Sequence, residues 1–265
     1  MPEDLAHFYV PGVEMAIVTC GSRERHWTAE EPIMNLCLIV PSEGMFVRRA
    51  DGVEHVVDSV RAYVQIPGEV QQIAHPAGGD VCTAIKASEP IIGALGDPSR
   101  LHRAALIISP AVDLAHRILL ARARDRAEDF ELSERAANLV GGIVDTDPLV
   151  HSERTSRLDR RLAARVREAI EGDNPSTLVE LAQVTGVSAY RLSRSFRRVT
   201  GLTVTRYRSQ LRTRQALARL SQGDRNLAGI AADVGFADQA HLTRTLRAYS
   251  GQTPGALRAV LAPSP

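Results

Sequence analysis

The sequence predicts an α+β protein, with a small β-barrel in the N-terminal half and an all-α domain carrying two helix-turn-helix units in the C-terminal half. Short strand-like runs fill residues 10 to 88, and apolar residues at helical spacing fill much of the remainder. One helical motif also occurs twice after residue 177. A chain of 265 residues is long enough for two modest domains, each with its own core. We expect a barrel over 1–97, a helical segment over 98–144, a linker over 145–156 and a helical domain over 157–260.

The strands expected in the N-terminal half are short apolar runs separated by Gly, Pro and Asp. They are "MAIVTC", "MNLCLIVP", "MFVRRADGVEHVVD", "RAYVQIP" and "VCTAIKA", with a hairpin turn at "ADG". Strands at such intervals indicate a small barrel or sandwich. The chain then turns helical, with Val112, Ala115, Leu119 and Ala123 on one stripe of "PAVDLAHRILLARARDRAEDF", followed by "LSERAANLVGGIV". The stretch "DTDPLVHSERTS" has the composition of a linker.

Charge is divided unequally between the two halves. Residues 156 to 265 hold 18 arginines against 8 acidic residues, a balance of +10, which leaves 14 basic and 23 acidic residues, a balance of −9, for the rest. No acidic residue occurs in the 43 positions between Glu180 and Asp224, whereas nine arginines do. A surface of one sign is the pattern that phosphates require, so the C-terminal half is expected to bind a polyanion.

The repeated motif begins at Leu178 and again at Leu227. Gly186 matches Gly235 at an offset of 49, and Arg194 matches Arg244 at an offset of 50. Each copy has the pattern of helix, turn, helix. In the first copy, Thr177 and Glu180 form a capping-box pattern, Gly186 ends the first helix and Ser188 caps the second. The buried positions expected in the second helices are Leu192, Phe196 and Val199 in the first copy and Leu242, Leu246 and Tyr249 in the second.

The opposite face of each second helix carries the side chains expected to contact DNA. Arg reads guanine bidentately, Gln pairs with adenine, and Ala or Thr methyl groups meet the thymine methyl, while flanking arginines hold phosphates. The candidates are Tyr190, Arg191, Ser193, Arg194, Arg197 and Arg198 in the first copy, and Gln239, Ala240, Thr243, Arg244 and Arg247 in the second. The stretch "TVTRYRSQLRTRQALARLSQG", with Val204, Tyr207, Leu211 and Leu220, predicts a rigid helix between the copies that sets them about one DNA turn, roughly 34 Å, apart.

Residues 158 to 258 resemble the DNA-binding domain of the AraC/XylS family of bacterial transcription regulators, on the strength of the two copies and of "AADVGFADQAHLTRTLRAYSGQTPGALR". The resemblance implies a seven-helix domain whose first helix is "LDRRLAARVREAIEGDNP", with Leu158, Leu162, Val166 and Ile170 buried and Gly172 near its end. Departures from the family pattern are His241, Leu242, Leu246 and Leu257, which apolar packing can absorb, and Ala240, which weakens base readout. The family also implies contact with RNA polymerase, and helices at 98–144 that pair two subunits; the alternative is that these helices only pack on the barrel.

The N-terminal half resembles, in a general way, the cupin-like sensor half of such regulators. It lacks the His-x-His pair of metal-binding cupins, since His26, His55 and His75 are isolated, so no metal, cofactor or catalytic residue is predicted. A small-molecule effector is expected, with Arg25, His26, Trp27, Gln71 and His75 as candidate contacts. Two alternatives stay open: a thiol sensor using Cys20, Cys37 or Cys82, and a barrel that serves only dimerisation or a partner protein.

The resulting hypothesis is a cytoplasmic, homodimeric, non-enzymatic transcription regulator that binds double-stranded promoter DNA. Three cysteines without a CxxC pair fit a reducing compartment. The acidic N-terminus and the short apolar runs predict neither a secretory signal nor a membrane span. The competing hypotheses are a cupin-type metalloenzyme that carries a basic domain, and an RNA-binding or architectural protein without sequence preference.

Overall fold

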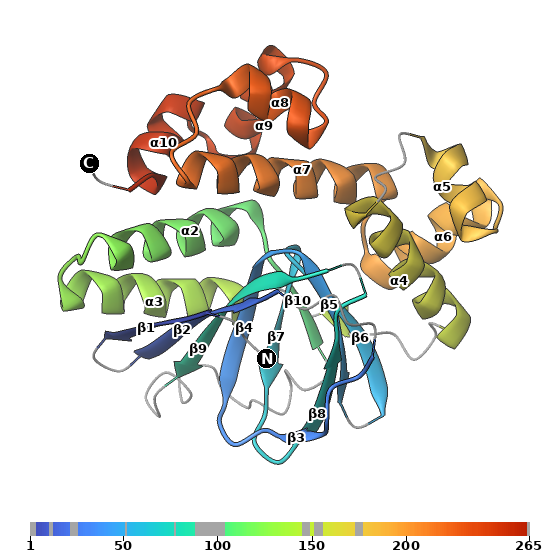
Figure 1. The fold of residues 1–265 in the computed structure, drawn as a ribbon, viewed down its shortest axis with the longest axis horizontal. Helices are drawn as coiled ribbons and strands as arrows, with labels where there is room; N and C mark the ends of the chain where they lie inside the picture. The colour runs from blue at the N-terminus through green and yellow to red at the C-terminus, as the bar shows by residue number, and fades with distance from the viewer. Residues whose placement is uncertain are drawn as a thin grey trace.

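The computed structural model describes residues 4–10, 13–21, 26–50, 52–76, 78–87, 104–144, 149–150, 156–172 and 177–263. Two antiparallel sheets form the N-terminal half, and helices form the C-terminal half (Figure 1). The predicted α+β class, with two helix-turn-helix units in the second half, is confirmed. Among the described residues, no helix is long and apolar enough to cross a membrane.

The larger sheet has the strand order β1-β2-β9-β4-β7-β10-β11, and the smaller has the order β3-β8-β5-β6. The larger sheet consists of β1 (Asp4–Val10), β2 (Val13–Cys20), β9 (Asp80–Ala87), β4 (Cys37–Glu43), β7 (Arg61–Gln65), β10 (Ala104–Ile107) and β11 (Leu149–Val150). The smaller consists of β3 (Glu31–Pro32), β8 (Val70–Ala74), β5 (Met45–Ala50) and β6 (Val53–Asp58). The predicted "ADG" hairpin joins β5 to β6, and Gly52 has the left-handed φ of 74° that this turn requires.

Side chains alternate between the two faces of the larger sheet, and both faces are buried. Its inner face meets the smaller sheet in a cluster made of Ile39, Phe46, Val57, Tyr63 and Cys82. Its outer face is covered by α2 (Pro110–Arg124) and α3 (Asp129–Val144), in a core that includes Leu38, Val40, Val64, Ile85, Leu119 and Leu139. Helices α2 and α3 therefore pack on the barrel.

Three details differ from the sequence expectation. Part of the segment expected to be helical is strand β10, and β11 lies within the expected linker and pairs with β10. Ala115 of α2 is exposed, although the sequence places it on the buried stripe. This helix packs between the sheet and the C-terminal domain, and the residues that it buries include Asp113, His116 and Arg117.

The C-terminal domain consists of seven helices within the described residues, as the resemblance implies. They are α4 (Arg157–Glu171), α5 (Leu178–Thr185), α6 (Ala189–Thr200), α7 (Val204–Ser221), α8 (Leu227–Val234), α9 (Gln239–Ser250) and α10 (Pro254–Leu261). Two cores form, one around Leu192, Phe196 and Tyr207, the other around Leu217, Leu242 and Leu257. Helix α7 contributes to both, so it joins the two units rigidly (Figure 1). Leu158 is 65% exposed, contrary to expectation, because its neighbour Asp159 takes the buried position.

Candidate nucleic-acid interface

Each helix-turn-helix unit is built by local signals that the sequence carries. Thr177 and Glu180 form the capping box of α5, and Gly186 ends that helix with a left-handed φ of 68°. The hydroxyl of Ser188 accepts a hydrogen bond from the backbone N–H of Arg191, which begins α6 at the expected residue. In the second unit, Asn226 caps the start of α8, Gly235 ends that helix, and Asp238 caps the start of α9. Caps and turns thus fix where α6 and α9 start.

Helix α6 turns its arginines away from the core. Leu192 and Phe196 are fully buried on one side, while Tyr190 is 73% exposed on the other. The remaining candidates of this helix are exposed or, for Ser193, half-buried: Arg191, Ser193, Arg194, Arg197 and Arg198. A guanidinium N–H of Arg194 donates to the hydroxyl of Tyr190 at 3.4 Å, one helical turn away. A hollow of about 540 Å³ borders this face, lined by Leu178, Tyr190, Ser193, Arg194, Arg197, Arg198, Thr203, Val204 and Thr205.

Helix α4 is joined to α6 by polar contacts of Asp159 that the sequence did not predict. The carboxylate of Asp159 accepts hydrogen bonds from the hydroxyl of Ser195, at 2.6 Å, and from Arg198, at 3.0 Å. The Ser195 hydrogen bond, outweighing partial burial, lowers the pKa of Asp159 below its usual value. Arg198 is therefore anchored to the protein and is less free than Arg194 or Arg197 to follow a phosphate.

Helix α9 presents a second outer face. Leu242 and Leu246 are buried and Tyr249 is half-buried, as expected. The predicted contacts on the other side are exposed, apart from the half-buried Thr243: Gln239, Ala240, Thr243, Arg244 and Arg247. His241, at a position that departs from the family pattern, packs edge-on against Phe236 with ring centroids 5.1 Å apart. The structure therefore places each set of candidate DNA contacts on one outer face of its helix.

The N-terminal half contacts both units, which the sequence did not predict. At the first unit, Asp58, the last residue of β6, is fully buried. It accepts a hydrogen bond from Tyr207 at 2.9 Å and faces the guanidinium of Arg167 at 3.2 Å. Burial first, and then Asp58, raises the pKa of Tyr207, so this phenol stays protonated as the donor. Val60 adds an apolar contact to the core of this unit.

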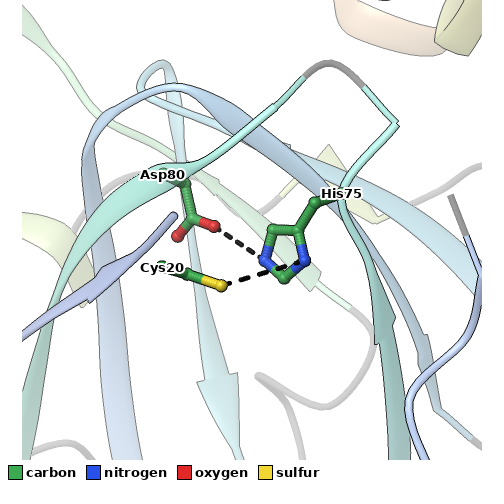
Figure 2. A group of neighbouring side chains, drawn as sticks. All are labelled: Cys20, His75 and Asp80. Carbon is green, nitrogen blue, oxygen red and sulfur yellow. Dashed lines mark hydrogen bonds and ion pairs between the residues drawn. The ribbon is translucent and has the colours of Figure 1, made fainter. Parts of the chain in front are cut away.

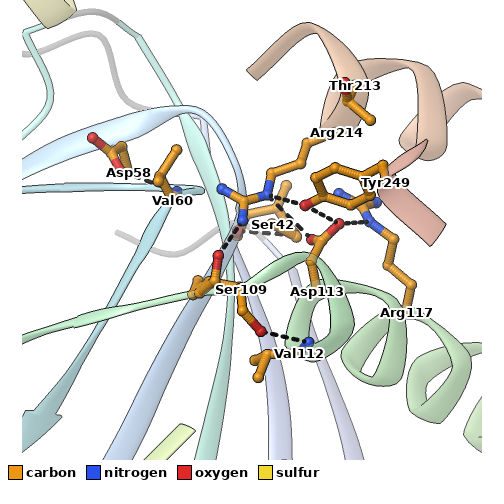
Figure 3. A network of polar contacts seen from close by, with 12 residues as sticks. Ser42, Asp58, Val60, Ser109, Val112, Asp113, Arg117, Thr213, Arg214 and Tyr249 are labelled. Carbon is orange, nitrogen blue, oxygen red and sulfur yellow. Dashed lines mark hydrogen bonds and ion pairs between the residues drawn. The ribbon is translucent and has the colours of Figure 1, made fainter. Parts of the chain in front are cut away.

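At the second unit, Asp113 of α2 lies in a polar network that joins the domains (Figure 3). The Tyr249 hydroxyl donates to Asp113 at 3.2 Å and accepts from Arg214 of α7 at 3.0 Å. Arg214 also donates to the Ile108 carbonyl, and Arg117 pairs with Asp113 at 3.3 Å. Burial raises the pKa of Asp113, but Arg117 and Arg214 outweigh it and keep this pKa below its usual value. The barrel and α2 thus hold opposite ends of the DNA-binding domain.

The predicted effector contacts do not gather at one point. Trp27 is half-buried beneath the guanidinium of Arg49, 3.9 Å from the ring centroid, and His26 is exposed. Gln71 is buried inside the barrel, where it accepts hydrogen bonds from Arg48 and Gln65. His75 lies beside Cys20 and Asp80 (Figure 2). Arg25 lies outside the described residues.

The cysteines of the open thiol-sensor interpretation differ in environment. Cys82 is buried, and Cys20 and Cys37 are half-buried. Burial is the main cause that raises the pKa of both Cys37 and Cys82, which disfavours their reactive thiolate forms.

Comparison with known proteins matches residues 181–259 to a family model described as a helix-turn-helix domain. The regulator RipA of Corynebacterium glutamicum is 34% identical over 123 residues, which is 46% of this chain and 35% of RipA. The arabinose operon regulatory protein of Escherichia coli is 33% identical over 101 residues, which is 36% of this chain and 35% of that protein. The chain thus spans about a third of the length of these relatives. Among solved structures, ToxT from Vibrio cholerae aligns with 95% of this chain and 98% of its own, at 9% identity and a TM-score of 0.37.

Proposed function

We propose that this protein is a transcription regulator of the AraC/XylS type that binds double-stranded promoter DNA sequence-specifically. The match of residues 181–259 to a helix-turn-helix family model and the likeness to two bacterial regulators support this proposal. One observation carries the proposal: α6 and α9 each turn an exposed, arginine-bearing face away from the core, and one continuous helix joins the two units. Arginines on such a face serve both base reading and phosphate contact.

The connecting helix has a length that suits two neighbouring contacts on one DNA face. Its 18 residues correspond to about 27 Å of α-helix. Successive major-groove segments on one face of B-DNA lie about 34 Å apart. A helix of this length, with the recognition helices extending from its two ends, allows α6 and α9 to enter adjacent groove segments.

The N-terminal half is proposed to control this binding. Its contacts through Asp58 and Asp113 involve both helix-turn-helix units, so a ligand that alters this packing would change the relation between the two recognition helices. A small-molecule effector bound by the barrel, a homodimer and contact with RNA polymerase belong to the proposal, as does a cytoplasmic setting. ToxT has been solved with an unsaturated fatty acid bound, and an organic acid of that kind is a reasonable first compound to test.

The experiment is a selection of bound fragments from sheared host genomic DNA at near-physiological salt. Enrichment of a few sites with two contact blocks about one helical turn apart is the expected result. Uniform, salt-sensitive recovery at every ligand condition tried would favour an architectural or RNA-binding protein instead.

Arg194→Ala is the matched test on an enriched site. We expect it to reduce discrimination between the site and random DNA by about 1–3 kcal/mol, because a bidentate guanine contact is lost. Arg225→Ala removes one exposed charge from the loop before α8, outside helices α6 and α9, and serves as the control. Equal weakening on all sequences would show that Arg194 contacts phosphate only.

A further inference from the structure

Three side chains from separate strands meet at one end of the barrel, outside the proposed DNA interface (Figure 2). Cys20 is the last residue of β2, His75 follows β8, and Asp80 is the first residue of β9. Each offers one atom able to ligate a metal, and these atoms all lie within 4.8 Å of one another. We propose that Cys20, His75 and Asp80 bind a divalent transition-metal ion of the zinc type.

The donor set has the chemistry that zinc prefers. Thiolate sulfur, imidazole nitrogen and carboxylate oxygen are its three common protein ligands, and a site with three protein ligands keeps one position for water or another small ligand. A thiolate and a carboxylate also neutralise the charge of a dication. When the ion binds, the S–H bond of Cys20 breaks, the sulfur–metal bond forms, and the proton is released to solvent.

The spacing requires little rearrangement. Metal–ligand bonds of about 2.0–2.3 Å place two ligands of a tetrahedral ion roughly 3.3–3.7 Å apart. His75 ligates an ion through one ring nitrogen, and with one ligand atom from each residue the three atoms lie within 4.8 Å of one another. Side-chain shifts of about 1.5 Å or less would bring them to the separation that one tetrahedral ion requires.

The carboxylate of Asp80 is buried and directed at the cluster. Its side chain is only 6% exposed, and its Oδ1 lies 2.9 Å from Nε2 of His75 without the geometry of a hydrogen bond. Buried carboxylate oxygens are costly to leave without a partner. The second oxygen, Oδ2, accepts a hydrogen bond from the thiol of Cys82 at 3.0 Å, which fixes the carboxylate orientation as an outer-shell partner would.

The backbone around the cluster is also built for close approach. A Cβ on Gly79 would lie 2.2 Å from the Cys20 carbonyl oxygen, and a Cβ on Gly44 would lie 2.3 Å from the Gly79 carbonyl oxygen. Glycine at position 79 therefore lets the segment before Asp80 lie directly against the end of β2, and glycine at position 44 lets the turn between β4 and β5 lie against Gly79. Gly21 and Gly79 are exposed, so an ion can reach the ligands from solvent.

The test uses the full-length chain without an affinity tag, reduced, stripped with chelator and titrated with Co²⁺ as a spectroscopic stand-in for Zn²⁺. We expect one Co²⁺ per chain, a thiolate-to-cobalt charge-transfer absorption, and displacement by one equivalent of Zn²⁺. Cys20→Ser should abolish this absorption and weaken binding more than about tenfold. Cys37→Ser, which removes a half-buried thiol outside the cluster, should leave both unchanged.

A second readout does not depend on variants. Bound Zn²⁺ should slow alkylation of Cys20, mapped by mass spectrometry, while leaving the alkylation rate of Cys37 unchanged. Absence of stoichiometric Co²⁺ binding, or binding that survives Cys20→Ser with its absorption intact, would overturn the proposal. Neither result depends on whether the chain binds DNA, so the metal site and the proposed function fail or succeed separately.

Discussion

Replacing Asp58 by Asn removes one negative charge from the contact between the barrel and the first helix-turn-helix unit while keeping the shape of the side chain. Asp58 is fully buried, and Arg167, which it faces at 3.2 Å, is 2% exposed. Two nitrogens of Arg167 make no hydrogen bond, so the Asp58 carboxylate is its main compensation among the described residues. A buried charge left without its partner costs about 3–5 kcal/mol. We expect Asp58→Asn to lower the free energy of unfolding by that amount.

Equilibrium unfolding in urea measures this change. Trp27 is the only tryptophan and reports on the barrel through its fluorescence, while far-ultraviolet circular dichroism reports mainly on the helices. Because Asp58 joins the halves, we also expect the two signals to change at more widely separated urea concentrations in the variant. Lys86→Gln breaks an exposed pair with Glu14 and should cost about 1 kcal/mol or less. A loss below about 1 kcal/mol for Asp58→Asn would refute the argument that this carboxylate balances Arg167.

Three further predictions concern the stability of the folded chain. Burial first, and then Asp58, raises the pKa of Glu171 to about 7 from 4.5, so the folded state keeps a proton that the unfolded chain releases, and stability falls as pH rises through this window. Glu171→Gln should remove this decline and exceed the wild type by up to about 3 kcal/mol near pH 8; an identical pH dependence of urea unfolding in both proteins would contradict it. Tyr249→Phe deletes the hydroxyl between Arg214 and Asp113 and should cost about 1–3 kcal/mol in the same assay; an unchanged midpoint would show that the network adds no stability. Gly186→Ala forces a side chain into a left-handed turn of φ 68° and should cost about 1 kcal/mol; a raised melting temperature would contradict that requirement.

The C-terminal domain could be predicted in detail because its determinants are local. Thr177, Ser188 and Gly186 act within one or two turns of their own position. The buried stripe of α6 also follows directly from helical periodicity. The prediction that Leu158 is buried is wrong, because helical periodicity alone marks an apolar residue as buried. In the first turn of α4 the buried side chain is Asp159, which accepts a hydrogen bond from Ser195.

The contacts between the domains could not be predicted because no local rule links their partners. Asp58 and Tyr207 are 149 residues apart, and Asp113 and Tyr249 are 136 apart. A buried acid on an otherwise apolar stripe is a weak sign of a distant cation, and Asp113 on α2 was such a sign. Short strands such as β8, within "VQQIA", gave too little apolar alternation to be recognised.

The cluster of Cys20, His75 and Asp80 could not be predicted from the sequence either. A search for His-x-His finds ligands that one strand presents together, whereas Cys20 and Asp80 lie on two different strands and His75 follows a third. Strand register brings them together, since Cys20 pairs with Asp80 across β2 and β9. Register depends on the whole sheet, so the sequence alone predicted no metal here.

The pairing of β11 with β10 shortens the tether between the two halves of the molecule. Strand β11 ends at Val150 and the next described residue is Ser156, so even a fully extended connection spans only about 20 Å. If the contacts at Asp58 and Asp113 open, the DNA-binding domain remains within that radius, at an effective concentration in roughly the millimolar range. An interface too weak to hold two separate proteins would therefore stay closed most of the time, and a signal of modest free energy would suffice to shift it.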